Sequence, residues 1–230
     1  MDGRSQMRAL SSRDIVRVVV EKHLRFKTAG LVFEEREPDD ESARDLIAAY
    51  REGRSPPWMT AYLLGCLRAP SAYETVKQIL TTAPRLLAES YAGVAMARIR
   101  GAGAEADLRE IMFDGSELRV REGAAYGLSK LDRVELVPAV RDALARKRIR
   151  RATAAHVLRC LHISVSDVLT LLRSTDEAER ALGMDLAWFV LERSQAPDVI
   201  SLIQTAMSTV HLAPRTRRQL EERLTKSIAK

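Results

Sequence analysis

The fold is decided by the stretch Val120-Arg121-Glu122-Gly123-Ala124-Ala125-Tyr126-Gly127-Leu128-Ser129-Lys130-Leu131. In it a small residue, Ala125, is followed by an apolar residue three positions later and by another six positions later. The small position recurs at Ala61, Gly93, Ala125, Ala155 and Gly183. The two apolar positions recur as Leu64 and Leu67, Met96 and Ile99, Leu128 and Leu131, Leu158 and Leu161, and Leu186 and Phe189. Successive copies are offset by 32, 32, 30 and 28 residues, so the chain contains an internal repeat.

Each copy has the spacing of a helix with one buried stripe. Residues three positions apart lie on the same helical face, and a small residue at a fixed point lets two crossing helices approach closely. Between these helices lie further segments with helical apolar periodicity, which begin at Val76, Leu108, Leu136, Val165 and Val199. Prolines fall in the expected first turns, where the missing N–H costs little, at Pro56-Pro57, Pro84, Pro138, Pro197 and Pro214. Each copy is therefore predicted to be a helix hairpin, and the protein to be all-α.

The pattern resembles a known repeat family. Residues 120–128, followed by Leu136-Val137-Pro138-Ala139-Val140-Arg141-Asp142-Ala143-Leu144, resemble the HEAT-like repeat, including its phycobilin-lyase-type form. The resemblance covers residues 41–212. It implies an α-solenoid, a HEAT-like superhelix of about five to six antiparallel helix hairpins whose second helices line the concave side. It indicates the fold much better than the function, because HEAT arrays serve many tasks.

The two ends of the chain differ from the middle. Residues 1–40 are predicted to hold an N-terminal helix within 11–30, although a Val-rich run leaves a strand open as the alternative. An acidic connection follows from Glu34 to Glu41, with a helix cap near Asp40 or Glu41. Residues 41–212 form the repeat array. Residues 213–230 form a polar capping helix, as a terminal repeat requires.

Composition narrows the class of protein. With 230 residues, of which 46% are hydrophobic, the chain can bury a core without disulfides or metals. Cys66 and Cys160 lack the dense spacing of a disulfide framework, and no run is apolar enough for secretion or membrane insertion; a reducing, cytoplasmic location is therefore expected. The net charge of +6 and the pI near 9.6 favour acidic partners. The basic stretches, 141–151 and the C-terminus, are also typical of solvated helix ends.

A candidate binding surface follows from the phase of the second helices. Positions about 200° from the buried stripe form a ridge on each of them. We predict that these ridge residues bind a partner, because large rigid side chains and arginine are enriched at protein interfaces. They are Trp58, Tyr62, Arg98, Tyr126, Lys130, His156, Arg180, Met184 and Trp188. The alternative is that several ridge residues, especially Cys66, Val94 and Met184, pack against the neighbouring repeat.

The sequence supports two hypotheses about function. The first is a non-catalytic scaffold or adaptor that holds a protein partner on this ridge. The second is a nucleic-acid binder that uses Arg98, Lys130, Arg150, Arg151 and Arg180. In length, pI and architecture the chain resembles the HEAT-like alkyl-purine DNA glycosylases, which implies aromatic residues and a carboxylate facing the lesion. Asp185 with Trp188 is the nearest match, but the family's spacing of Trp and Asp is not reproduced.

No catalytic, cofactor or metal site is predicted. No Gly-rich phosphate loop, Ser/His/Asp set or acid–base pair emerges, and Gly101-Ala102-Gly103 follows no predicted strand. His156 and Cys160 share a helical face and could supply two metal ligands, but no third ligand stands at a recognisable spacing. None of the four histidines is followed by Glu, so the His-Glu pairs of HEAT-type iron hydroxylases are absent. The oligomeric state and the identity of the partner stay open.

Overall fold

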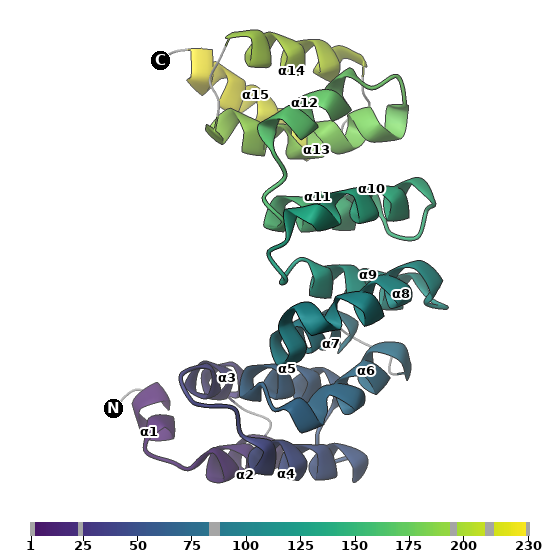
Figure 1. Cartoon of the computed structure of the whole chain (residues 1–230). Coiled ribbons are helices and arrows are strands. Elements are labelled where there is room, and N and C mark those ends of the chain that lie inside the picture. The colour runs from purple at the N-terminus through teal and green to yellow at the C-terminus, as the bar shows by residue number, and fades with distance from the viewer. Residues whose placement is uncertain (1–2, 23–24, 83–87, 194–196, 210–213, 229–230) are drawn as a thin grey trace. The chain divides into compact units, whose positions relative to one another are not determined.

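Helices make up the regular structure of this protein. A computed structural model describes residues 3–22, 25–82, 88–193, 197–209 and 214–228, and within these ranges it contains helices and no strand (Figure 1). The all-α prediction is therefore confirmed, and the strand that the Val-rich run had left open is replaced by a helix over Ser12–Lys22. None of the described helices is both long enough and apolar enough to cross a membrane.

The chain divides into two compact units, Met1–Leu131 and Asp132–Lys230. The elements of the first unit are α1 (Gly3–Arg8), α2 (Ser12–Lys22), α3 (Phe26–Glu34), α4 (Asp40–Arg51), α5 (Pro57–Leu67), η1 (Pro70–Ala72), α6 (Tyr73–Thr82), α7 (Ala88–Arg100), η2 (Gly101–Ala104), α8 (Glu105–Asp114) and α9 (Leu118–Leu128). The elements of the second are η3 (Val134–Leu136), α10 (Val137–Ala145), α11 (Arg151–Cys160), α12 (Val165–Arg173), α13 (Glu177–Arg193), α14 (Pro197–Thr209) and α15 (Pro214–Ile228).

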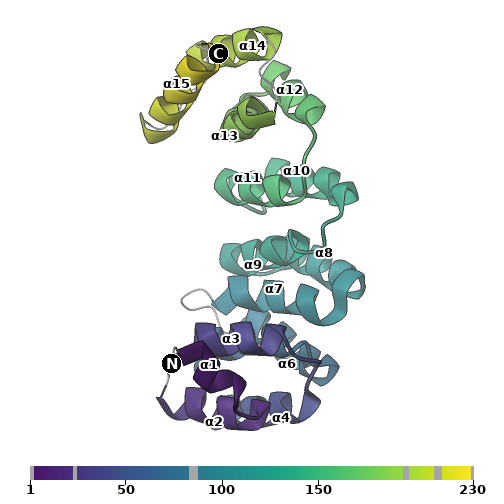
Figure 2. The same ribbon diagram turned by 90° about the vertical axis from the view of Figure 1, so that its left-hand side faces the viewer.

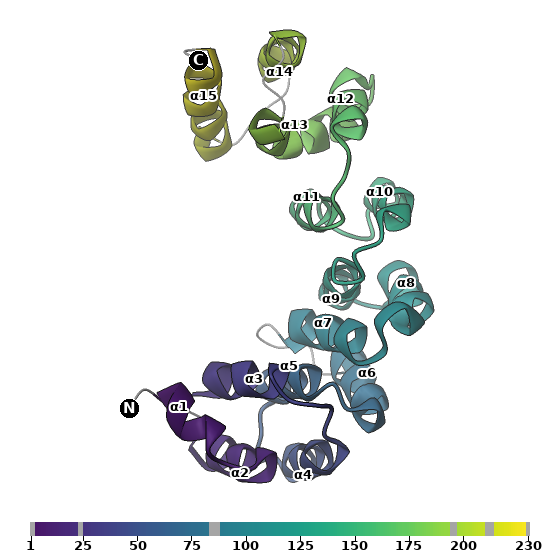
Figure 3. The same ribbon diagram turned by 60° about the vertical axis from the view of Figure 1, so that its left-hand side comes forward.

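The helices of the first unit form successive pairs: α2 with α3, α4 with α5, α6 with α7, and α8 with α9. The second helix of each pair also packs on the second helix of the next, so α3, α5, α7 and α9 make one layer. Figure 3 shows this layer on one side of the unit and α2, α4, α6 and α8 on the other. The predicted helix hairpins are therefore present, and the core lies between the two layers.

The start signals read from the sequence are found at the helix ends. Pro57 is the first residue of α5, Pro138 lies in the first turn of α10, and Pro197 and Pro214 begin α14 and α15. Pro84 lies outside the described residues. The small positions of the repeat also face the core as predicted, with Ala61, Gly93, Ala125 and Gly183 buried, although Ala155 is only half-buried.

Helices α7 and α9 cross at glycines. A Cβ atom added to Gly93 would stand 1.9 Å from the carbonyl oxygen of Gly123, and one added to Gly127 would stand 2.5 Å from the carbonyl oxygen of Gly93. Backbone therefore meets backbone where these helices cross, which only glycine allows. The small residue of the repeat serves here to bring successive second helices together. Gly183 differs, because its nearest neighbours are Leu171 and Leu172 of α12.

The first pair of helices lies within residues 1–40, where a single helix was predicted. Arg25, the N-cap of α3, is left-handed with φ of 60°, a conformation that a continuing helix does not allow, so α2 and α3 are separate. α3 is a further copy of the repeat: Ala29 and Val32 stand 32 residues before Ala61 and Leu64 and are 0% and 1% exposed. The repeat therefore begins before residue 41.

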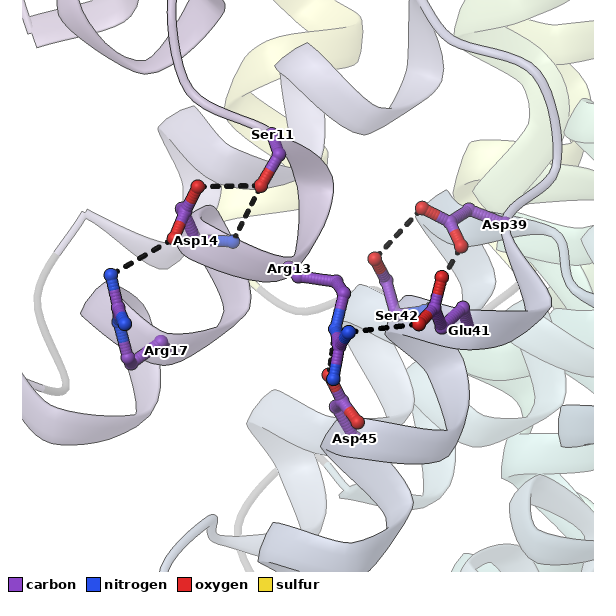
Figure 4. A network of polar contacts seen from close by, with 8 residues as sticks. All are labelled: Ser11, Arg13, Asp14, Arg17, Asp39, Glu41, Ser42 and Asp45. Carbon is purple, nitrogen blue, oxygen red and sulfur yellow. Dashed lines mark hydrogen bonds and ion pairs between the residues drawn. The ribbon is translucent and has the colours of Figure 1, made fainter.

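Polar contacts join this first pair to the next (Figure 4). The Arg13 guanidinium on α2 donates from Nη1 to Glu41 Oε1 at 2.8 Å and from Nε to Asp45 Oδ2 at 2.7 Å. The Asp39 carboxylate accepts the backbone N–H of Ser42 at 2.9 Å and caps α4 one residue earlier than predicted. Exposed ion pairs contribute little individually, so the buried stripes of α2 and α3 supply most of the attachment.

The second unit repeats the same arrangement of pairs. α10 packs on α11 and α12 on α13, as Figure 2 shows, and α13 also packs on α11, α14 and α15. Its core contains Leu158, Ile163, Val168 and Leu186, each at most 1% exposed. The last helix, α15, buries Leu220 and Leu224 and exposes the polar residues Arg217, Arg218, Gln219, Glu221 and Glu222.

Candidate partner-binding surface

The ridge residues predicted from helical phase are exposed to different degrees. Arg98 and Lys130 are exposed, and Trp58, Tyr62, Tyr126, His156 and Arg180 are half-buried. Met184 is 0% exposed and belongs to the core, as the alternative interpretation had it. The physical reason is that α13 packs on α11, α12 and α15, so a side chain turned away from its own pair still meets a neighbouring second helix. The side chain of Trp188 lies outside the described residues.

Four aromatic rings from α3, α5 and α7 touch one another, and we call them the aromatic row: Phe26, Trp58, Tyr62 and Tyr91. The Phe26 ring lies 4.9 Å from Trp58 and 5.5 Å from Tyr62, and Tyr62 lies 5.3 Å from Tyr91, all in edge-to-face geometry. Such pairs are favourable beyond the area that they bury. All four side chains are half-buried, so the row is a partly open surface built from three successive second helices.

Helix α3 positions the aromatic row through a glycine. A Cβ atom added to Gly30 would stand 2.5 Å from Cε1 of Tyr62, so the tyrosine ring lies against the bare backbone of α3. Phe26 and Tyr91 were not among the predicted ridge residues. A repeat that begins at residue 41, as the resemblance implies, leaves Phe26 outside the array. The signal that could have found it is the repeat itself, since Phe26 stands 32 residues before Trp58.

At the other end of the same helices stands a second set, which we call the polar ladder: Glu34, Cys66, Arg98 and Lys130. Its members are spaced by 32 residues; the first three lie on α3, α5 and α7, and Lys130 lies two residues beyond the end of α9. Arg98 Nη1 donates to Glu34 Oε1 at 2.7 Å and to Cys66 Sγ at 3.4 Å, and the Cys66 thiol donates to Glu34 Oε1 at 3.6 Å. The ladder therefore ties three helices together below the aromatic row.

The thiol in the ladder is buried. Burial raises the pKa of Cys66 to about 12, and the neighbouring Arg98 only partly offsets this effect. Burial also raises the pKa of the Tyr62 hydroxyl. Both groups are therefore neutral near pH 7, whereas a nucleophilic cysteine must be a thiolate. We find in the ladder no group poised for nucleophilic attack.

Two more carboxylates of this helix layer are buried. Glu89 on α7 and Glu122 on α9 are each 4% exposed. Glu89 Oε1 has no hydrogen-bond partner, and Nε of Arg119 approaches it to 3.9 Å. Helix α5, between Pro57 and Leu67, carries no charged residue at all. The open face of the layer therefore presents aromatic groups and few carboxylates.

In the second unit the residues of the nucleic-acid hypothesis have other partners. Arg151 Nε donates to Asp185 Oδ2 at 2.8 Å, and burial raises the pKa of Asp185. Arg180 Nη1 donates to the carbonyls of Ser174 and Thr175, at 2.8 and 2.7 Å. Arg121 of the first unit makes the same contacts with the carbonyls of Gly115 and Ser116, so the role of Arg180 is to hold the loop of its own pair. Arg150 is exposed.

The possible metal ligands remain two. Cys160 Sγ lies 3.7 Å from His156 Nε2, and His156 Nδ1 faces Arg159 Nη2 at 3.2 Å. A search of the described residues finds no group of three His, Cys, Asp or Glu side chains that could hold a metal ion. A closed zinc site needs four ligands, and this pair supplies two.

Comparisons with models of known protein families, with curated proteins and with solved structures found no match.

Proposed function

We propose that this protein is a HEAT-like helical-repeat module that works as a non-catalytic scaffold or adaptor in the cytoplasm and holds a segment of a partner protein. The binding face is the outward side of α3, α5, α7 and α9, called here the front surface. The observation that carries the proposal is the aromatic row, whose four half-buried rings lie side by side on three successive helices. Aromatic side chains give large contact area at low entropic cost.

The HEAT-like superhelix is part of this proposal. It is supported by helix pairs that follow one another at a period near 32 residues and by second helices that pack in series through glycine. In such arrays each pair contacts only its neighbours, and binding surfaces run across several pairs. A segment that lies on this face would meet Trp58, Val94 and Tyr126, all half-buried.

A protein partner is favoured over nucleic acid by the state of the cations. Arg151 is paired with Asp185, and Arg180 is bound to backbone carbonyls. The positive charge of the chain also lies mainly outside the first unit, because residues 132–230 hold 17 of the 37 Lys and Arg but only 12 of the 31 Asp and Glu. Affinity for nucleic acid depends on cations free to displace counterions from phosphates.

Site-specific photo-crosslinking tests the proposal. A benzophenone amino acid replaces Val94 on the front surface, and a second protein carries it instead of Val134, which is 52% exposed in η3. In extract of the source cells we expect a discrete adduct from position 94, identified by mass spectrometry as one protein segment. Equal adducts from both positions would show that the front surface binds nothing specific.

Two variants then decide whether the aromatic row is responsible. Trp58→Ala should abolish the adduct from position 94 while the helical circular dichroism is kept. Because Trp58 packs on Phe26, a variant that leaves the ring contacts intact is needed beside it. Val94→Glu serves this purpose when the crosslinker is placed at Tyr126, and Val134→Glu is its matched control. An adduct at position 126 that survives both Trp58→Ala and Val94→Glu contradicts the proposal.

A further inference from the structure

The polar ladder ends in Lys130, a cation with no partner among the residues that the structure describes. Glu34, Cys66 and Arg98 contact one another, but the next member, Lys130, is exposed. Among the described residues no carboxylate lies within 4.0 Å of Lys130. It stands two residues beyond the end of α9, next to the helix that carries Arg98, and these two helices meet at Gly93, Gly123 and Gly127.

Arg98 also has donors to spare. Its contacts with Glu34 and Cys66 both use Nη1, although a guanidinium has five N–H donors. The side chain is 37% exposed, so the remaining donors can reach solvent or a ligand. A guanidinium that is bound to one carboxylate through Nη1 can still donate to a second carboxylate from its remaining N–H groups.

We propose that Arg98 and Lys130 together bind a carboxylate of the partner, so that the partner segment is acidic and carries an apolar anchor for the aromatic row. This inference rests on the proposed function and names the chemistry of its partner. Charge complementarity supports it: on this layer Glu34 is paired with Arg98, and Glu89 and Glu122 are buried. Lys27 and Lys130 are exposed, and no carboxylate of the described chain pairs with either.

The distance between the aromatic row and the polar ladder determines how far apart the apolar and acidic residues of the partner segment should be. Tyr91 belongs to the aromatic row and Arg98 to the polar ladder, seven residues apart on α7. At 1.5 Å of rise per residue this separation is about 10 Å. An extended segment covers that distance in about three residues. The expected partner motif is an aromatic or large aliphatic side chain with an Asp or Glu about three positions away.

Peptide selection with the full-length protein tests the inference. A random 16-residue peptide library displayed on phage is panned against the wild-type chain, and the enriched peptides are synthesised and measured by fluorescence anisotropy. We expect an apolar anchor with nearby Asp or Glu. Lys130→Glu should weaken binding about tenfold at low salt, and the loss should shrink as salt rises, because exposed charges are screened. Lys130→Arg should restore the affinity.

Lys147→Glu is the matched control, since it makes the same charge change at an exposed lysine of the second unit. Peptides that need Trp58 but are neutral or basic and bind Lys130→Glu as well as wild type overturn the acidic-partner inference and leave the proposed function standing. Peptides that bind Trp58→Ala unchanged, or a selection that enriches nothing, overturn the proposed function itself. Salt-sensitive binding of a DNA oligonucleotide that competes with the peptides would overturn the choice of an acidic peptide.

Discussion

Replacing Gly93 by alanine should separate α7 from α9. The new Cβ would stand 1.9 Å from the carbonyl oxygen of Gly123, whereas ordinary contact begins at 3.4 Å, so the helices must move apart by the difference of 1.5 Å. The obstacle is backbone, which cannot turn aside as a flexible side chain can.

The magnitude follows from two opposing effects. Overpacking a close-packed site costs about 1–3 kcal/mol, and the upper part of that range applies here because no side chain can rearrange. Alanine returns about 0.8–1 kcal/mol of helix propensity. The net loss is then about 2 kcal/mol, which lowers the melting temperature of a chain of this size by about 4–8 °C.

Thermal and urea unfolding followed by circular dichroism measure this loss. Gly103→Ala is the control, because its Cβ would meet nothing nearer than 3.8 Å and its φ is not positive. A Gly93→Ala protein as stable as the Gly103→Ala protein would refute the claim that α7 and α9 meet backbone to backbone.

Two further predictions concern titratable groups of the first unit. The hydrogen bond from Lys77, together with that from Tyr73, holds the pKa of Asp107 below its usual 3.8. The ionised carboxylate therefore stabilises the fold above that pH, and this stabilisation is lost as the pH falls further. Asp107→Asn should flatten this part of the acid unfolding curve, and a curve unchanged by the substitution would contradict the assignment. Cys66 is 0% exposed, and burial raises its pKa to about 12. A thiol reagent at pH 8 should therefore label Cys160 first and Cys66 only on unfolding. Rapid labelling of Cys66 in a Cys160→Ser protein would show that the Cys66 thiol is accessible to solvent in the folded protein.

Much of the fold could be predicted from the sequence because each repeat has a small residue at a fixed position, followed by apolar residues three and six positions later. Ala61, Gly93 and Ala125 marked three of the second helices of the first unit, and their burial follows from the same stripe that defined them. The start of the array was placed too late. In α3 the third apolar position of the repeat is taken by Glu35, which binds Arg8 at 2.9 Å on the surface, so the pattern was incomplete there.

The candidate surface was predicted less completely. Helical phase placed Trp58, Tyr62 and Arg98 on one face, but it could not tell that Met184 meets a neighbouring helix, because burial depends on the packing of α13 on α11 and α15. Helical phase also could not predict which side chains contact each other between helices. The contact of Arg98 with Glu34 spans 64 residues and needs three helices side by side, which only the fold supplies.

The polar ladder makes the protein tolerant of length changes in some places and intolerant in others. The three members in contact lie on α3, α5 and α7, so an extra residue in the turn between α8 and α9 should leave the contacts of Arg98 with Glu34 and Cys66 unchanged. An extra residue within α7 between Gly93 and Arg98 would rotate Arg98 by about 100° and break its contact with Glu34. Homologues should therefore vary in the lengths of their turns and keep the count of residues between the glycine crossing and the end of each second helix.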